Sequence, residues 1–449
     1  MKRVLVAGAG VAAVECVLAL RELAGARVSV ELLAPAAELV HRPSSVKTPF
    51  GGEPAPRIDL HQLARDLSVL IHPDGLASVQ AERNHVLTRD GATLAYDLLV
   101  VATGARSREA VPGSVTFRGP LSAGLVEQAI DRVTADPALR LAFAAPQGVR
   151  WLLPLYELAL LSAVTLRERG IDEPDIVVAT GEHQPLEVFG PAASEAIQRE
   201  LRRAGIELVT SAPAISALDG ALNLANGELL SADVVVALPE VVGPRISGLP
   251  HDEDGFIPVD EHGHVEGCID VFAAGDVTSF PLKHGGLAAQ QADAVAEAIA
   301  AQVGAVVSPE PFRPVLRGLL VTGERPLYLR AELGPGGQRE HRLLPAPGSS
   351  SYGALWWPPG KVAGRYLTRF IATATASGNT LQDLPATAGP DGISLILQAA
   401  EEDAAAGDYA SATRALDDAE AWLGPLSERA NERRDAWRRL LAPERSNST

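Results

Sequence analysis

The sequence predicts an α/β protein in which one doubly wound β-α-β arrangement occurs twice, followed by an α+β region and a helical tail. A glycine-rich turn joins a buried strand to a helix near the N-terminus. The same alternation of apolar runs and helical periods restarts after residue 114. A later strand ends in Gly275-Asp276 and belongs with the first unit. The 449 residues suffice for two or three domains, each with its own core.

The two units contain the same kinds of element in the same order. The first is predicted to comprise strands over residues 3–7, 28–33 and 98–102, a helix over 11–23, a loop over 41–52, and short strands between 76 and 94. The second is predicted to comprise strands over 139–144, 175–179, 206–209 and 234–238, and helices over 154–169 and 192–204. The chain then returns to the first unit through the Gly275-Asp276 strand and a helix over 287–303, so that unit is discontinuous.

The C-terminal part of the chain is richer in proline and glycine and less periodic. Strands are predicted over 316–321 and 326–329, and a helix over 362–374. Residues 392–441 are predicted to form three helices, of which the first two resemble a tetratricopeptide-repeat (TPR) hairpin. The predicted domains are a first Rossmann-like domain (1–113 and 251–305), a second Rossmann-like domain (114–250), an α+β interface region (306–385) and a TPR-like tail (386–449).

The turn after the first strand has the composition of a pyrophosphate site. Gly8 permits a tight turn, Gly10 lets the backbone approach a phosphate, and Ala13 is small enough for close helix–strand packing. The helix that starts at Val11 and Ala12 presents free N–H groups and the positive end of its dipole. The alternative is a glycine-rich turn without a ligand.

Three segments together carry a family resemblance: the turn at Gly8 and Gly10, the strand end Ala102-Thr103-Gly104, and the strand end Gly275-Asp276. In this order they resemble the pyridine nucleotide-disulfide oxidoreductase superfamily, flavoproteins with two dinucleotide-binding domains. The resemblance implies non-covalently bound FAD, with the Asp276 carboxylate accepting a hydrogen bond from a ribityl hydroxyl. The alternative role of Asp276 is a helix N-cap.

The resemblance also implies other residues around the cofactor. These are Ala34 at the end of the second strand, Arg42 and Pro43 in the following loop, Arg106, and Lys283, Gly285, Gly286 and Leu287 at a helix start. The ribose-binding acid expected near Ala34 is missing, and Glu31 and Glu38 are the two acids that can compensate. Lys283 and His284 are the candidate catalytic residues, as a positive charge beside the flavin and as a proton donor. A structural role is the alternative for His284.

The second unit lacks the glycines of a standard NAD(P)H site. Arg150 and Trp151 stand before the helix where a G-x-G-x-x-G motif is expected, which makes NAD(P)H doubtful. Glu182 leaves NAD(P)H binding as an alternative, because an acid after the second strand of this unit can hold a ribose hydroxyl. The stretch around Tyr156-Glu157 resembles sulfide:quinone oxidoreductases and flavocytochrome c sulfide dehydrogenases, but the cysteine that precedes it in those families is absent.

The composition of the chain argues against several classes of binding partner. The formal charge of −17 argues against nucleic acid and against an anionic membrane surface. No apolar run is long enough to span a bilayer, no metal-ligand spacing is visible, and a strand begins at once after Met1, so we expect a cytoplasmic protein. The tail offers a surface for a homodimer or a protein partner.

We therefore expect an FAD-dependent oxidoreductase that resembles sulfide:quinone oxidoreductases but lacks their redox cysteines. It would pass electrons from a donor to an acceptor, each a small molecule or a redox protein. One alternative is an NAD(P)H-dependent flavin reductase with an atypical nucleotide site. Another is a flavin-binding scaffold that acts through its helical tail.

Overall fold

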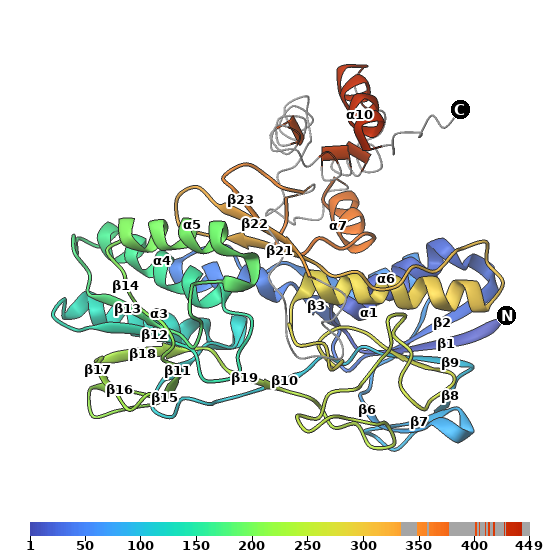
Figure 1. Ribbon diagram of the computed structural model, residues 1–449. Coiled ribbons are helices and arrows are strands. Elements are labelled where there is room, and N and C mark those ends of the chain that lie inside the picture. The colour runs from blue at the N-terminus through green and yellow to red at the C-terminus, as the bar shows by residue number, and fades with distance from the viewer. Residues whose placement is uncertain are drawn as a thin grey trace.

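The computed structural model places two α/β lobes side by side, with a smaller C-terminal sheet above the region where they adjoin (Figure 1). The described residues are 1–333, 348–356 and 359–376, and in the tail 400, 401, 404, 409, 412, 413, 416, 417, 426 and 428–441.

The first lobe is built on a parallel sheet of five strands in the order β20-β9-β1-β2-β5. These strands are β1 (Lys2–Ala7), β2 (Val28–Leu33), β5 (Leu70–His72), β9 (Leu98–Val101) and β20 (Val271–Ala273). Helices α1 (Val11–Leu23) and α6 (Gly285–Gln302) pack on one face and bury Val17, Val295 and Ile299. Because β20 lies far along the chain from β9, the first sheet is assembled from two separate segments, as predicted.

Smaller elements complete the first lobe. They are 3-10 helices η1 (Gly25–Arg27), η2 (Arg42–Phe50) and η3 (Ala81–Arg83), helix α2 (Leu60–Asp66), the pair β3 (Glu38–Val40) and β4 (Arg57–Asp59), and an antiparallel sheet of β6 (Leu76–Gln80), β7 (His85–Thr88) and β8 (Thr93–Ala95). The predicted loop over 41–52 is thus largely the helix η2, whose turns are closed by local bonds such as that from the Gly51 N–H to the Thr48 carbonyl.

The second lobe repeats this plan with a parallel sheet in the order β11-β18-β12-β13-β14. Its strands are β11 (Val115–Thr116), β12 (Leu141–Ala144), β13 (Ile176–Ala179), β14 (Glu207–Val209) and β18 (Val234–Ala237). Its helices are η4 (Gly119–Ser122), α3 (Ala123–Ala135), α4 (Leu153–Glu168), η5 (Glu187–Phe189) and α5 (Pro191–Arg203). An antiparallel sheet of β15 (Ala214–Leu218), β16 (Ala221–Leu224) and β17 (Leu229–Ser231) precedes β18, as β6–β8 precede β9.

The strand–helix turn differs between the two lobes. Between β1 and α1 it consists of Gly8, Ala9 and Gly10, whereas between β12 and α4 it runs over eight residues, 145–152. Glu15 and Glu157 are each the fifth residue of their helices, so the repeated plan brings them to equivalent positions. The prediction of two parallel-strand α/β units is confirmed, with insertion at the second turn.

The lobes are joined by an antiparallel ribbon of β10 (Arg106–Arg108) and β19 (Glu240–Val242). Above them lie the strands β21 (Val315–Leu320), β22 (Leu327–Glu332) and β23 (Ser349–Ser351), and the helix α7 (Leu367–Ala376) (Figure 1). The helix predicted over 362–374 begins only at Leu367, because the preceding backbone is held against α1 by contacts described below. Trp356 packs on Tyr328 of β22, with ring centroids 5.1 Å apart.

Most of the predicted TPR-like tail lies outside the described residues. The part that is described includes α10 (Glu428–Leu441) and a buried cluster to which Ala412, Leu416 and Trp437 contribute. The TPR-like arrangement itself stays a prediction.

Candidate functional site

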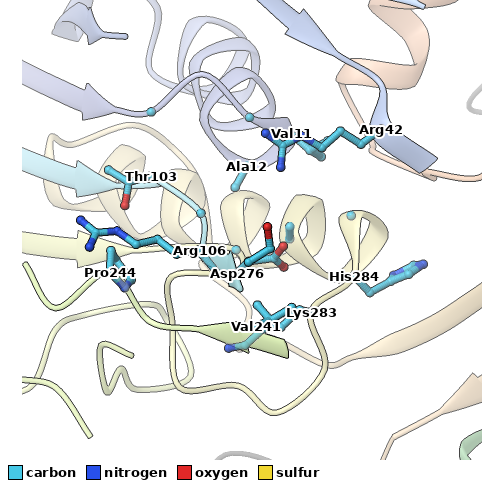
Figure 2. A pocket seen from close by; sticks show the side chains of 18 of the residues that line it. Val11, Ala12, Arg42, Thr103, Arg106, Val241, Pro244, Asp276, Lys283 and His284 are labelled. Carbon is cyan, nitrogen blue, oxygen red and sulfur yellow. The ribbon is translucent and has the colours of Figure 1, made fainter. Parts of the chain in front are cut away.

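A cavity of about 930 Å³ lies where the carboxyl ends of the two parallel sheets face each other. Four segments of the chain form about half of its wall: the β1–α1 turn, the end of β9, the connection from β20 to α6, and the β12–α4 turn. Figure 2 shows Asp276 near the centre of this space, with Ala12 on one side and Lys283 on the other. Ligands of doubly wound proteins bind at this edge of the sheet.

Gly8 is the residue whose conformation fixes the first turn. Its φ is +145°, and a Cβ atom there would lie 2.1 Å from the Ala102 carbonyl oxygen. No atom lies within 4 Å of the place where a Cβ of Gly10 would stand. Gly10 is also the N-cap of α1 and has no side chain to occupy the first N–H groups of that helix. The turn therefore leaves a helix N-terminus open toward the cavity, which suits a phosphate group.

Asp276 presents a carboxylate to the same cavity. The preceding Gly275 has a φ of +83° and its N–H donates to Gln291 Oε1 at 2.7 Å. Within the described part of the chain, no group donates a hydrogen bond to the Asp276 carboxylate. Burial raises the pKa of Asp276, whereas Lys283 and Arg42 lower it. A buried acceptor without a donor can take a hydrogen bond from a ligand hydroxyl.

Lys283 lines the cavity, but its ammonium group is engaged by the protein. Its Nζ donates to the carbonyl oxygens of Thr278 at 2.5 Å and Phe280 at 2.8 Å, and it lies 3.5 Å from the centre of the Phe256 ring. Burial lowers the pKa of Lys283 to about 8, although Asp276 opposes the shift. Lys283 thus supplies a positive charge beside Asp276 at neutral pH.

His284 is the N-cap of α6. Its Nδ1 accepts a hydrogen bond from the Leu287 N–H at 3.3 Å, and its ring lies edge-on to that of Trp151 with centroids 4.5 Å apart. Burial lowers the pKa of His284 to about 3, helped by Lys361 and Arg317. The imidazole is therefore neutral at pH 7. This geometry matches the structural alternative for His284 rather than an acid that is protonated at neutral pH.

The depressed pKa of His284 makes stability depend on pH. The unfolded chain binds a proton near pH 6.5 and the folded chain near pH 3, so the free energy of unfolding should fall as the pH drops through this window. His284→Asn keeps a capping acceptor but has no group that titrates. We expect this variant to reduce the change of unfolding free energy with pH by up to about 1.4 kcal/mol per pH unit. Urea unfolding between pH 4 and 7 measures it. An unchanged slope in this variant would contradict the assignment.

The β12–α4 turn offers few donors for a phosphate. Leu152, the N-cap of α4, is buried, and Pro154 in the first turn has no N–H. The Leu155 N–H donates to the Leu152 carbonyl at 3.0 Å. Trp151 lines the cavity and also faces Phe189, with ring centroids 6.1 Å apart. This helix N-terminus consequently lacks the open cradle that α1 presents.

Glu182 does not line the cavity. Its Oε2 accepts hydrogen bonds from the Tyr156 hydroxyl at 2.7 Å and from the Leu186 N–H at 3.1 Å. Burial raises the pKa of Glu182 to about 7, against the effect of these hydrogen bonds. The carboxylate is thus already bonded within the second lobe.

A buried ion pair stands in the wall of the cavity next to α4. Lys361 Nζ contacts Glu157 Oε1, and the same oxygen accepts a hydrogen bond from the Val321 N–H at 2.8 Å. Burial raises the pKa of Glu157 and lowers that of Lys361, and each partner opposes the shift of the other. Lys47 on η2 adds a second nearby positive charge. Sequence reasoning missed Lys361, because no motif marks its position.

Most residues expected around the cofactor lie in the wall of this one cavity. They are Gly8, Gly10, Val11, Ala12, Arg42, Pro43, Ala102, Thr103, Gly104, Arg106, Gly275, Asp276, Lys283, His284 and Gly285. Four expected residues do not reach it: Ala13, Ala34, Gly286 and Leu287. Ala13 and Leu287 are packed in the cores, and Gly286 lies against the His284 ring.

The expectation that Ala34 lies beside the cofactor is corrected by the structure, because Ala34 does not line the cavity. Its N–H donates to the His72 carbonyl at 3.0 Å and its side chain is buried, so the neighbouring Leu33 and Pro35 line the cavity instead. Of the two acids that can compensate, Glu38 lines the cavity and also pairs with Arg57 at 2.8 Å. Glu31 faces away and contacts His72 at 2.7 Å.

The family model for pyridine nucleotide-disulphide oxidoreductases matches residues 2–141 and 159–301. The chain belongs to this family. The predicted resemblance is thereby confirmed, and the protein is a flavoprotein oxidoreductase. Members of the family bind FAD and use NAD(P)H. The open α1 N-terminus, the glycine cradle and the Asp276 carboxylate in the cavity wall fit FAD in the cavity described above.

Two curated relatives illustrate the range of the family. An NADH dehydrogenase-like protein of Mycobacterium tuberculosis is 28% identical over 242 residues, which cover 49% of this chain and 60% of the relative. The ferredoxin–NAD(+) reductase subunit of the benzene 1,2-dioxygenase system of Pseudomonas putida is 27% identical over 328 residues, covering 68% of this chain and 77% of the relative. The first match thus spans less than two thirds of that relative.

Solved structures share the fold. The sulfide:quinone oxidoreductase of Aquifex aeolicus superposes with a TM-score of 0.67 at 19% identity, covering 78% of this chain and 87% of that one. The putidaredoxin reductase–putidaredoxin complex gives a TM-score of 0.55 at 20% identity, with 74% and 81% covered. At these identities the likeness concerns the fold alone. Within the described ranges, no helix is long and apolar enough to cross a membrane, and no cluster of side chains could hold a metal ion.

Proposed function

We propose that this flavoprotein passes electrons from a donor other than a pyridine dinucleotide to a small-molecule or protein acceptor. The observation that carries the proposal is the first turn of α4, with buried Leu152, Pro154 and the bonded Leu155 N–H. A pyrophosphate needs free N–H groups and close backbone approach, which this turn does not offer. The arrangement resembles sulfide:quinone oxidoreductases in fold only.

The two cysteines do not serve as redox groups in the cavity under this proposal. Cys16 is buried in α1, Cys268 is only partly exposed, and neither lines the cavity. Burial raises the pKa of both thiols, which disfavours the reactive thiolate. Sulfide oxidation through cysteine persulfides is therefore not part of the proposal.

The chain's own residues would hold and tune the cofactor. Gly10 and the first turn of α1 would take the pyrophosphate, Asp276 a ribityl hydroxyl, and Glu38 the adenosine ribose. FAD bound there supplies two-electron transfer. Lys283 and the N-terminus of α6 would stabilise negative charge on the reduced ring. The Glu157–Lys361 pair lies in the wall of the same cavity, where it would present a fixed dipole to bound reactants.

A second candidate function is reduction of the flavin by NAD(P)H. It is favoured by the curated relatives, whose names include NADH dehydrogenase-like proteins and ferredoxin–NAD(+) reductases, and by the reach of the cavity to Arg150 and Trp151. For such a reductase the electron acceptor would be a redox protein, as in the ferredoxin systems.

An anaerobic titration of the FAD-loaded protein separates the two candidates. If the proposal is right, the flavin stays oxidised and keeps its absorbance near 450 nm when NADH or NADPH is added in about tenfold excess. Dithionite then reduces the flavin and bleaches this absorbance. Bleaching by either nucleotide would overturn the proposal and establish the reductase. A protein truncated by residues 386–449 should give the same flavin titration. The third interpretation, a flavin-binding scaffold that acts through its tail, instead predicts that the truncated protein loses a protein partner.

A further inference from the structure

Two carboxyl groups outside the cavity face each other between α1 and α6. Glu15 is fully buried, and its carboxyl group hydrogen-bonds with that of Asp293. Two ionised carboxylates in contact repel strongly, so one of the pair must carry a proton. No residue of the cavity belongs to this pair, and the proposed flavin chemistry does not use it.

The donors around the pair decide where the proton resides. Glu15 Oε1 accepts a hydrogen bond from the Tyr366 N–H at 2.7 Å, and Glu15 Oε2 accepts one from the Leu367 N–H at 2.7 Å. Backbone donors of this kind stabilise a charged carboxylate. Asp293 Oδ1 is buried and accepts no hydrogen bond from the described residues. Burial raises the pKa of Asp293 well above its usual range, and Glu15 adds to the shift. The proton therefore belongs to Asp293.

The two N–H groups that donate to Glu15 belong to Tyr366 and Leu367, at the start of the helix α7. These two residues are the last of a segment, residues 359–367, that runs from the second lobe to the first, and we call this segment the strap. At one end Lys361 contacts Glu157 on α4, and at the other Gly364 lies so close to Glu15 that a Cβ atom would stand 2.5 Å from Oε2. Glu15 and Glu157 are both fifth residues of their helices. The strap is thus held at equivalent points of the two lobes.

We propose that Asp293 holds the proton that lets Glu15 anchor the strap, and that this carboxyl pair thereby positions Lys361 in the cavity. The part concerning Lys361 rests on the proposed function, whereas the anchoring of the strap does not. Loss of the proton would place a second negative charge against Glu15, a repulsion that the nearby Arg365 offsets only in part. The strap should then loosen at the Tyr366 and Leu367 amides.

The groups that face the pair come from every element packed against it. They are Glu15, Cys16 and Glu22 from α1, Asp293 and Glu297 from α6, and Arg365 and Tyr366 from the strap. Arg365 is paired with Glu297 at 3.1 Å. Because the folded pair binds a proton that an unfolded Asp releases near pH 4, anchoring is complete at low pH and is lost as the pH rises through the folded pKa.

Hydrogen exchange of the Tyr366 and Leu367 amides, expressed as protection factors in the FAD-loaded full-length protein from pH 5 to 10, tests the proposal. In the wild type, protection should fall about tenfold per pH unit above the pKa of the pair. Asp293→Asn, which keeps a donor to Glu15 without a titratable proton, should give a flat profile. Glu297→Gln, the control, removes the charge that pairs with Arg365 and that raises the pKa of Asp293, so it should keep the wild-type slope with its midpoint at lower pH.

A second readout reports on Lys361. The flavin absorption spectrum should show a pH step with the same midpoint as the exchange data in the wild type, and no such step in Asp293→Asn. A wild-type protection profile that is flat to pH 10, or an Asp293→Asn profile that follows the wild type, would overturn the anchoring. Failure of the electron-donor proposal would leave the exchange result unaffected, so the two failures are distinguishable.

Discussion

Replacing Gly8 with alanine is expected to abolish retention of FAD and to lower the free energy of unfolding by about 3 kcal/mol or more. The new methyl group would lie 2.1 Å from the Ala102 carbonyl oxygen, and the φ of +145° is strained for any L side chain. The turn must shift to relieve both, which moves the N-terminus of α1 away from the pyrophosphate. The ratio of bound FAD to protein after desalting, together with urea unfolding, measures the effect.

Gly124→Ala is the matched control for this change. Gly124 lies in α3, and no atom stands within 4 Å of its would-be Cβ. Alanine there should leave FAD bound and stabilise the helix by up to about 1 kcal/mol. If Gly8→Ala retained a full complement of FAD with unchanged stability, the first turn would not be the cradle inferred above.

Breaking the buried Glu157–Lys361 pair should cost about 3–5 kcal/mol of unfolding free energy. Lys361→Met leaves the Glu157 carboxylate buried with the Val321 N–H, and Glu157→Gln leaves a buried ammonium group. An uncompensated charge on a side chain with so little exposure is the physical reason for the large loss. The double variant removes both charges and should recover most of it, to within about 2 kcal/mol of the wild type.

An exposed pair provides the comparison. Arg108 and Glu240 contact each other at 2.6 Å on the ribbon between the lobes, with side-chain exposures of 63% and 32%. Arg108→Met should cost less than about 1 kcal/mol. Equal stabilities for the two single variants and the double variant of the Glu157–Lys361 pair would show that this pair is solvated and does not act as a buried ion pair.

The fold of the two lobes was accessible from sequence because local patterns coincide with it. The helix predicted over 11–23 is α1, and the strand predicted over 28–33 is β2, since apolar periodicity and a glycine turn both act within a few residues. Gly8, Gly10 and Asp276 were expected at one site for the same reason, because each lies within three residues of the end of a buried strand, and all three line the cavity.

Long-range contacts account for what the sequence did not reveal. Lys361 enters the cavity because a strap from the C-terminal region crosses to α4, and no local pattern marks such a crossing. The helix α7 begins at Leu367 because Glu15, more than 350 positions earlier in the chain, accepts its first N–H groups. Ala34 was misplaced because the register of β2 against β5, which sends its N–H to His72, depends on sheet pairing.

The discontinuity of the first sheet has a consequence for the order in which the chain acquires structure. All five strands of the second sheet come from one continuous stretch, residues 115–237, and can pair as soon as that stretch is available. The first sheet lacks its edge strand β20 until residue 273 has emerged from the ribosome. The second lobe is therefore positioned to mature first during synthesis, while β9 waits with an open edge for its partner. The lobe that we propose to hold most of the FAD is then the lobe completed last.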